Sequence, residues 1–218
     1  MEDSAIYGWT KAHLLEVLTG GKQPVLTNPD LITAFKLVDR AHFVDAKHLD
    51  SAYSDEDVDF KDGMENNSPV VVATMMQALD VKAGAKILEL GTGSGYTLAL
   101  LASAVGNEGF VYSLERDQQV LDIARKNLAH YPSLKNYEMI FKNASEGLWQ
   151  RAPFSAIFSG FSMSEMPATI LSQLSLGGRM VCPHTNSEIK IYTRINETQV
   201  QSQLLTVKKF SQMQAGLV

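Results

Sequence analysis

The segment "ILELGTGSGY", residues 87–96, limits the folds open to this chain more than any other stretch. An apolar run ends in an acid, and glycines follow at every second position, at Gly91, Gly93 and Gly95. Glycine adopts positive φ readily and lets another molecule lie against the backbone. A strand that turns through such a segment into a helix is typical of an open α/β sheet, in which ligands bind beyond the carboxyl ends of the strands. A tight turn that uses glycine for conformation alone is the alternative.

Short apolar strands alternate with helices after residue 85. The strand candidates are residues 86–90, 109–114, 137–141, 155–159, 179–182, 189–195 and 203–207, and the helix candidates are residues 95–105, 117–129 and 167–174. This alternation predicts an α/β fold with a doubly wound, mostly parallel Rossmann-like sheet. The link between the last two strands, "NETQVQS", is too short for a crossover and predicts an antiparallel C-terminal strand.

Helices are also expected in the first part of the chain. Apolar residues recur near helical spacing over residues 7–18, and a capping residue followed by proline begins a helix at Asn28 and again at residues 67–69. Residues 50–67 are polar, acidic and aperiodic, so we expect a loop there. We therefore predict added N-terminal helices, as an extension over residues 1–80 packed on an α/β domain over residues 81–218.

The composition suits one compact protein with a filled core, because 45% of the 218 residues are hydrophobic. The formal net charge is -5 and there is no long basic run, which argues against a dedicated nucleic-acid or membrane-surface binder. A single cysteine, Cys182, excludes an intrachain disulfide and a thiolate metal cluster. The five histidines lack metal-ligand spacing, so no metal site is expected.

Targeting signals are not evident in the sequence. The first residues, "MEDSAIYGWTK", lack the basic and apolar regions of a signal peptide. Apolar runs also fall short of the roughly 18 residues that a membrane-spanning helix needs. We therefore expect a cytoplasmic protein.

The glycine spacing discriminates between classes of ligand. A dinucleotide fingerprint is G-x-G-x-x-G and a P-loop needs a lysine after its last glycine, whereas this turn is G-x-G-x-G followed by Tyr96. A nicotinamide oxidoreductase is therefore the weaker alternative. Glu115 ends the next predicted strand at a spacing that suits the binding of two ribose hydroxyls. An ordinary exposed glutamate before a helix is the plain alternative for this residue.

An acid-terminated strand, a G-x-G-x-G turn and a second acid after the next strand together resemble the S-adenosylmethionine site of class I methyltransferases. The resemblance implies that the methionine half of the cofactor faces Gly91, Thr92, Gly93, Ser94 and Gly95. It also implies that Glu115 holds the ribose and that Glu89 lies near the cofactor's amino group. A purely structural role is the alternative for Glu89.

The flanking segments resemble one methyltransferase family, the protein-L-isoaspartate O-methyltransferases. The similar segments are "LVDRAHFVD", "AYSDEDVDF", "SPVVVATMMQALDVKAGAKILELGTGSGYTLALLA" and "APFSAIFSGFSMSEMPATILSQLSLGGRMVCP", so the match runs from about Leu14 to Val207. The resemblance implies methyl transfer from S-adenosylmethionine to the α-carboxylate of isoaspartyl residues in damaged proteins, the first step of their repair. The partner would be a protein or peptide substrate. The sequence does not indicate an oligomeric state.

Two departures from the family pattern fall in the expected site. The family carries T-I-S two residues before a proline and uses the serine hydroxyl, but aligned on Pro69 this chain has Glu65 for the threonine and Asn67 for the serine. The candidates for orienting the acceptor are therefore Asn67 and Ser68, with helix capping as the alternative. Asn143 replaces an aspartate that contacts adenine in the family. It keeps a carbonyl oxygen that can accept from the adenine amino group, and a turn residue is its alternative.

These departures leave two hypotheses open for the acceptor. The first is isoaspartyl methyl transfer. The second is a relative that binds S-adenosylmethionine but has a different or lost methyl acceptor.

Overall fold

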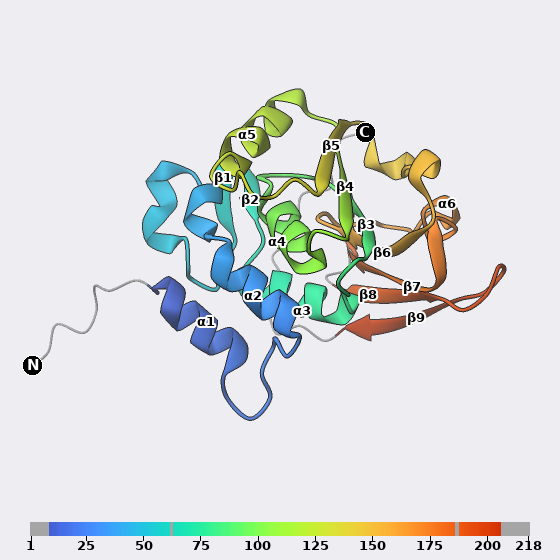
Figure 1. The fold of residues 1–218 in the computed structure, drawn as a ribbon, viewed down its shortest axis with the longest axis horizontal. Helices are drawn as coiled ribbons and strands as arrows, with labels where there is room; N and C mark the ends of the chain where they lie inside the picture. Colours follow the sequence, from blue (N-terminus) through green and yellow to red (C-terminus); the bar gives the residue numbers. More distant parts are fainter. Residues whose placement is uncertain (1–8, 62, 186–187, 206–218) are drawn as a thin grey trace, which may run out of the picture.

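The computed structural model describes residues 9–61, 63–185 and 188–205 (Figure 1). Seven strands form one sheet in the order β5-β4-β3-β6-β7-β8-β9, and β1 and β2 form a separate hairpin. The strands are β1 (Val58–Lys61), β2 (Met64–Asn66), β3 (Lys86–Leu90), β4 (Phe110–Glu115), β5 (Tyr137–Phe141), β6 (Phe154–Ser159), β7 (Leu174–Pro183), β8 (Ile189–Arg194) and β9 (Val200–Leu205). The α-helices are α1 (Lys11–Thr19), α2 (Pro29–Leu37), α3 (Pro69–Leu79), α4 (Tyr96–Val105), α5 (Gln118–Leu128) and α6 (Ala168–Leu171).

The strand order reverses at β3: the next two strands in the chain extend the sheet on one side of β3, and the later strands extend it on the other side. This strand pairs in parallel with β4 on one side and with β6 on the other. The turn that follows β3 therefore lies at the topological switch point, where ligands bind in folds of this type. β8 runs antiparallel to both β7 and β9. The predicted doubly wound, mostly parallel sheet with an antiparallel C-terminal strand is confirmed.

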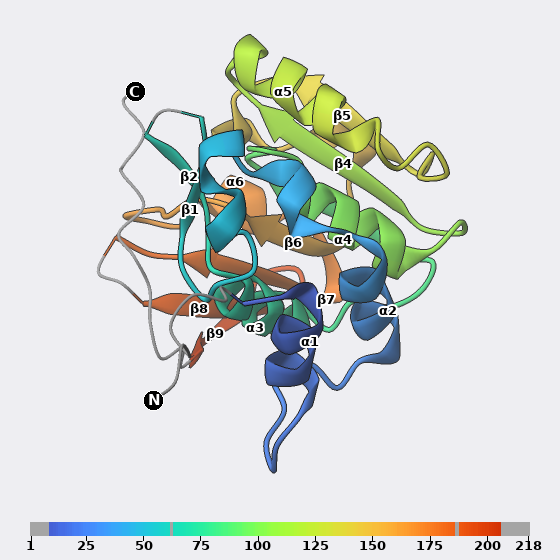
Figure 2. The same ribbon diagram turned by 90° about the vertical axis from the view of Figure 1, so that its left-hand side faces the viewer.

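Buried surfaces explain why these segments adopt these structures. Four of the five residues of β3 are buried, as expected for a parallel strand covered on both faces. α4 is buried along most of its length and lies beside α2 (Figure 2). None of the helices that the structure describes is long and apolar enough to cross a membrane.

The N-terminal helices share a core with the sheet. One buried cluster includes Leu18 and Phe35 from the N-terminal helices, Leu100 from α4 and Val181 from β7. Asn28 and Ser68 cap α2 and α3, and a proline occupies the first turn of each helix. The helix starts expected at Asn28 and at residues 67–69 are thus confirmed, whereas the helix expected over residues 7–18 is α1, which begins at Lys11. The division of the chain at residue 80 stays a prediction.

Three further sequence-based expectations differ from the structure. Residues 50–67 are not a plain loop, because a 3₁₀ helix, η2 (Ala46–Ser51), and the β1–β2 hairpin occupy most of this region. These strands are too short to show a period of two in the sequence. The helix expected over residues 167–174 is only α6, because the chain enters β7 at Leu174 to pair with Phe154. The last strand begins at Val200, and the predicted residues 206 and 207 lie outside the described part.

Arg40 is a buried cation that holds the N-terminal segments together. Its side chain is 1% exposed and lies in a second 3₁₀ helix, η1 (Arg40–Phe43). Its guanidinium donates to the carbonyl oxygens of Ala52 and Glu56 at 2.8 and 3.1 Å, and to those of Asn66 and Asn67 at 3.3 and 3.0 Å. Burial lowers its pKa. Arg40 therefore connects η1 to the hairpin and to the start of α3.

We predict that Arg40→Met lowers the free energy of unfolding by about 3–5 kcal/mol, because it leaves several buried carbonyl oxygens without their donor. Urea unfolding measures this loss. Arg125→Met is the matched control, since Arg125 lies on the surface of α5 and pairs with the exposed Asp122. The control should lose less than about 0.5 kcal/mol. Equal losses in the two variants would contradict the role of Arg40.

Candidate cofactor and acceptor site

The turn after β3 has the backbone that its glycines predict. Gly91, Gly93 and Gly95 have φ of 88°, 53° and 87°, in the left-handed region that favours glycine. The amides of Gly91 and Thr92 donate to the carbonyl oxygen of Leu114 at 2.9 and 3.2 Å. The turn therefore wraps over the carboxyl end of β4 before α4 begins.

The three glycines face different surroundings. A Cβ at Gly91 would lie 2.9 Å from the ring of Phe161, and one at Gly95 would lie 3.3 Å from side chains of α5. Among the described residues, a Cβ at Gly93 would meet the ring of Phe60, at 3.8 Å. Gly91 and Gly95 thus permit close packing within the protein. Gly93 is the least crowded of the three glycines among the described residues.

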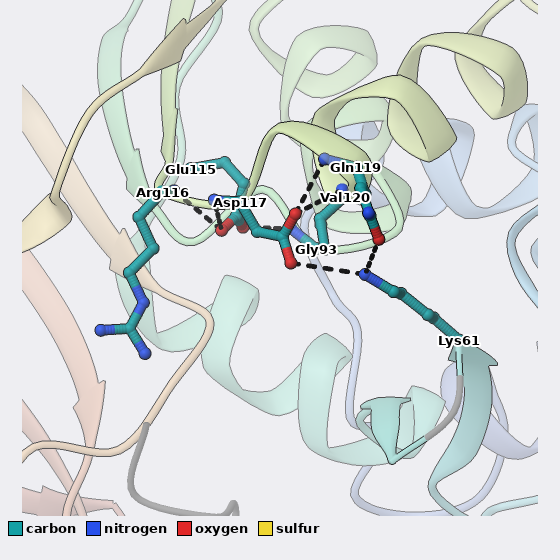
Figure 3. A network of polar contacts seen from close by, with 7 residues as sticks. All are labelled: Lys61, Gly93, Glu115, Arg116, Asp117, Gln119 and Val120. Atoms are coloured by element: carbon teal, nitrogen blue, oxygen red, sulfur yellow. Dashed lines mark hydrogen bonds and ion pairs between the residues drawn. The ribbon is translucent and has the colours of Figure 1, made fainter. Parts of the chain in front are cut away.

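Glu115 ends β4 beside this turn (Figure 3). Its Oε2 accepts from the amide of Gly93 at 3.2 Å, and its Oε1 accepts from the amides of Arg116 and Asp117 at 2.8 and 3.1 Å. A carboxylate has about four acceptor positions, and these three backbone amides fill three of them. A ribose that presents two hydroxyls would therefore have to replace one backbone amide. Ribose binding by Glu115 stays a prediction.

Glu89 lies wholly buried beneath the turn. Its Oε2 accepts from Ser113 Oγ at 2.5 Å, its Oε1 accepts from Thr97 Oγ1, and Ser113 Oγ also bonds Thr92 Oγ1 at 2.6 Å. Burial raises the pKa of Glu89 to about 7, the two hydroxyls oppose this, and the charge of Glu115 adds to it. These bonds support a structural role for Glu89, while contact with a cofactor amino group stays a prediction.

Asn66 joins the hairpin to the glycine turn, and the sequence reasoning missed it. Its Oδ1 accepts from Ser94 Oγ at 2.5 Å and its Nδ2 donates to the carbonyl oxygen of Phe43 at 2.6 Å. Asn66 is 8% exposed, and Asn127 Nδ2 also donates to the carbonyl oxygen of Ser94. No sequence signal marked Asn66, because β2 has only three residues and their burial does not alternate.

The two candidate acceptor residues differ in how the protein uses them. Ser68 caps α3, since its Oγ accepts from the amide of Val71 at 3.2 Å, and its own amide donates to Asp57 Oδ1 at 2.6 Å. Asn67 is partly buried, and its backbone oxygen accepts from Arg40. Ser68 is thus the residue that caps α3. A role of either side chain toward an acceptor stays a prediction.

Acidic side chains border this segment. Glu65 is exposed and pairs across the hairpin with Asp59. Partial burial raises the pKa of Glu65, and the charges of Asp57 and Asp59 raise it further. A carboxylate that approaches Asn67 therefore meets like charge.

Asn143 follows β5, whose Phe141 pairs with Glu115 at the same edge of the sheet. Its Oδ1 accepts from the amide of Ser145 at 3.0 Å and caps the short 3₁₀ helix η3 (Ala144–Glu146). Asn143 therefore acts as a turn and capping residue, which was its alternative in the sequence. The same oxygen has a second lone pair that suits an adenine amino group, so contact with adenine stays a prediction.

We predict that Glu89 makes the free energy of unfolding depend on pH. Its pKa rises from an ordinary 4.5 to about 7 on folding, so the folded state holds more protons between these values. The stabilising contribution of Glu89 is then complete below about pH 4.5 and is lost as pH rises through 7. The free energy of unfolding of wild type minus that of Glu89→Gln should therefore fall by roughly 3 kcal/mol as pH rises from 4.5 to about 7.

Urea unfolding from pH 4.5 to 8 measures this difference. Glu108→Gln, at an exposed position, is the control. A difference between wild type and Glu89→Gln that is constant with pH would contradict the prediction.

Comparison with known proteins identifies relatives over most of the chain. Residues 10–213 match the family described as protein-L-isoaspartate(D-aspartate) O-methyltransferase. A protein-L-isoaspartate O-methyltransferase of Aeropyrum pernix is 32% identical over 198 residues, which cover 91% of this chain and 75% of the relative. Protein-L-isoaspartate O-methyltransferase 1 of Archaeoglobus fulgidus is 36% identical over 150 residues, or 69% of each chain.

Solved structures agree on the fold. A structure described as a protein-L-isoaspartate O-methyltransferase superimposes with a TM-score of 0.79 at 23% identity and covers 94% of this chain and 67% of that chain. A Plasmodium falciparum structure with the same description, in complex with S-adenosyl-L-homocysteine, gives 0.78 at 21% identity over 94% and 98% of the two chains. The family match and the relatives confirm the resemblance read from the sequence: this chain belongs to the protein-L-isoaspartate(D-aspartate) O-methyltransferase family.

Proposed function

We propose that this chain binds S-adenosylmethionine at the turn after β3 and methylates the α-carboxylate of isoaspartyl residues in proteins. The observation that carries the proposal is the glycine turn at the switch point of the sheet, where Gly93 has positive φ and its amide donates to the carboxylate of Glu115. The family supports it, because the relatives are named for this activity. The S-adenosyl-L-homocysteine in the Plasmodium falciparum structure supports the choice of cofactor.

The residues present fit this cofactor. The Gly93 turn gives a backbone that a ligand can approach closely, and Glu115 supplies a carboxylate for the ribose once a backbone amide is displaced. Asn143 supplies a carbonyl oxygen at the end of the neighbouring strand for the adenine amino group. When bound, the cofactor supplies an electrophilic methyl group.

The chain itself has to bind, align and desolvate the acceptor. A carboxylate acceptor is already ionised at neutral pH, so the reaction requires no general base from the protein. Holding two reactants in line can by itself contribute several kcal/mol toward the barrier. The Asn67 amide is the group we assign to orient the acceptor, because Asn67 is only partly buried, whereas Ser68 is buried and caps α3.

A second candidate is a methyl acceptor other than isoaspartate. The observation that favours it is the position of Glu65, which faces outward beside Asn67 and opposite Asp59. The raised pKa of Glu65 reflects partial burial and the nearby acids. A second carboxylate would be repelled there, whereas a neutral or cationic acceptor would not.

We expect calorimetry to detect binding of S-adenosylmethionine, and Gly93→Val to abolish it. A branched side chain would occupy the space beside Gly93 and would be strained at a φ of 53°. Gly177→Val is the control, because Gly177 also has positive φ, with nothing within 4 Å of its Cβ position, but belongs to β7. Unchanged affinity in Gly93→Val would remove the turn from the site.

The acceptor is tested by methyl transfer to an isoaspartyl peptide, with the normal aspartyl peptide as control. We expect weak activity in the wild type and at least about a tenfold gain in the double variant Glu65→Thr with Asn67→Ser, because repulsion of the docking carboxylate is removed. The gain should appear mainly in KM for the peptide, while the cofactor affinity stays constant. Tight cofactor binding without activity in either protein would favour the second candidate.

A further inference from the structure

The β1–β2 hairpin contacts the turn after β3 and also contacts the start of α5, where Figure 3 shows Lys61 beside Asp117 and Gln119. The ring of Phe60 lies over Gly93, at 3.8 Å from the position of a Cβ there. Lys61 Nζ lies 3.3 Å from Asp117 Oδ2 and 3.2 Å from Gln119 Oε1, at the start of α5. At the other end of the hairpin, the buried Asn66 bonds Ser94 in the turn, as described above.

A bulge in the hairpin explains how neighbouring side chains reach the same domain. Asp59 pairs with Glu65 and Lys61 pairs with Met64, so the register shifts at Phe60. Consecutive side chains of a regular strand point to opposite faces, but a bulge re-aims them. Phe60 therefore covers the turn while Lys61 reaches α5.

The two ends of the hairpin differ in exposure. Asn66 is 8% exposed, whereas the side chains of Lys61 and Asp117 are 27% and 35% exposed. An ion pair at this exposure is weak and is screened by salt. The Asn66 end is thus a buried attachment, and the Lys61 end is a contact that can open.

The Lys61 contact lies next to the place proposed for the ribose. Asp117 is two residues beyond Glu115, and its amide donates to the Glu115 carboxylate at 3.1 Å. Asp117 Oδ1 caps α5 by accepting from the amides of Gln119 and Val120, while Oδ2 faces Lys61. A ligand held by Gly93 and Glu115 is therefore bordered by the hairpin on one side and by the start of α5 on the other.

We propose that Lys61 is a positioning residue: its contact with Asp117 and Gln119 holds the β1–β2 hairpin against α5 and thereby slows release of the cofactor. The inference rests on the proposed function, because it places the cofactor at Gly93 and Glu115. Lys61 does not touch the reacting atoms in this proposal. It acts through the hairpin and the Phe60 ring.

The experiment is stopped-flow dissociation of S-adenosyl-L-homocysteine, which carries no net charge at neutral pH. The variants are Lys61→Met, Asp117→Asn and the two combined. Asparagine can keep the oxygen that caps α5, while an uncharged amide NH2 replaces the oxygen that accepts from Lys61. Lys82→Met is the matched control, because Lys82 forms an exposed ion pair with Asp80 just after α3, before β3 begins.

We expect each single variant to raise the dissociation rate by about three- to fivefold, the size of one partly exposed ion pair. The combined variant should add little beyond Lys61→Met, because the same contact is lost. Lys61→Arg should stay within about twofold of wild type, since it keeps the charge. Added salt should raise the wild-type rate toward that of Lys61→Met, and kcat should not fall in that variant.

An electrostatic effect of Lys61 on Glu115 would give a different result. Removing the cation and removing the anion would then change the rate in opposite directions, and that outcome overturns the proposal. The proposal is also overturned if Lys61→Met still binds the ligand and releases it at the same rate as wild type and Lys82→Met. Absence of S-adenosyl-L-homocysteine binding by the wild type would instead overturn the proposed function, and the inference with it.

Discussion

The passage from β3 to α4 takes five residues, and its glycine backbone is the constraint on which the rest of the site depends. All three glycines lie at positive φ, and the turn bonds the end of β4 through the Leu114 carbonyl oxygen. Because β3 is the strand at which the sheet reverses, this turn is open to a ligand at the switch point. The acids at the ends of β3 and β4 are then placed by strand pairing, one buried beneath the turn and one beside it.

The N-terminal segments complete the site from the other side. Arg40 donates to four backbone carbonyl oxygens, from residues before the hairpin, at its end and at the start of α3, and so helps to fix where the candidate acceptor residues lie. Asn66 then sets the hairpin against Ser94. The candidate acceptor positions and the cofactor turn are thus parts of one hydrogen-bonded unit, although they come from distant parts of the chain.

The sequence predicted those parts whose local pattern is strong. β3 and β5 begin and end where expected, because each is a short apolar run bounded by turn signals, and Asn28 and Ser68 cap helices as their position before proline predicts. The hairpin was missed because its strands have few residues, and long-range contacts to Arg40 and Ser94 hold it in place. The turn glycines were recognised from their spacing between a predicted strand and a predicted helix, together with the two nearby acids. The bond between the Gly93 amide and Glu115 could not be foreseen, since it depends on how two strand ends meet.

The side-chain amide of Asn66 has an evolutionary consequence. Its nitrogen donates to Phe43 and its oxygen accepts from Ser94, so the orientation of the amide is fixed by both neighbours. Aspartate at position 66 would offer no donor to Phe43, and alanine at position 94 would leave the amide oxygen without its hydroxyl. Substitutions at these two positions should therefore occur together among close relatives, even though the positions lie in separate segments.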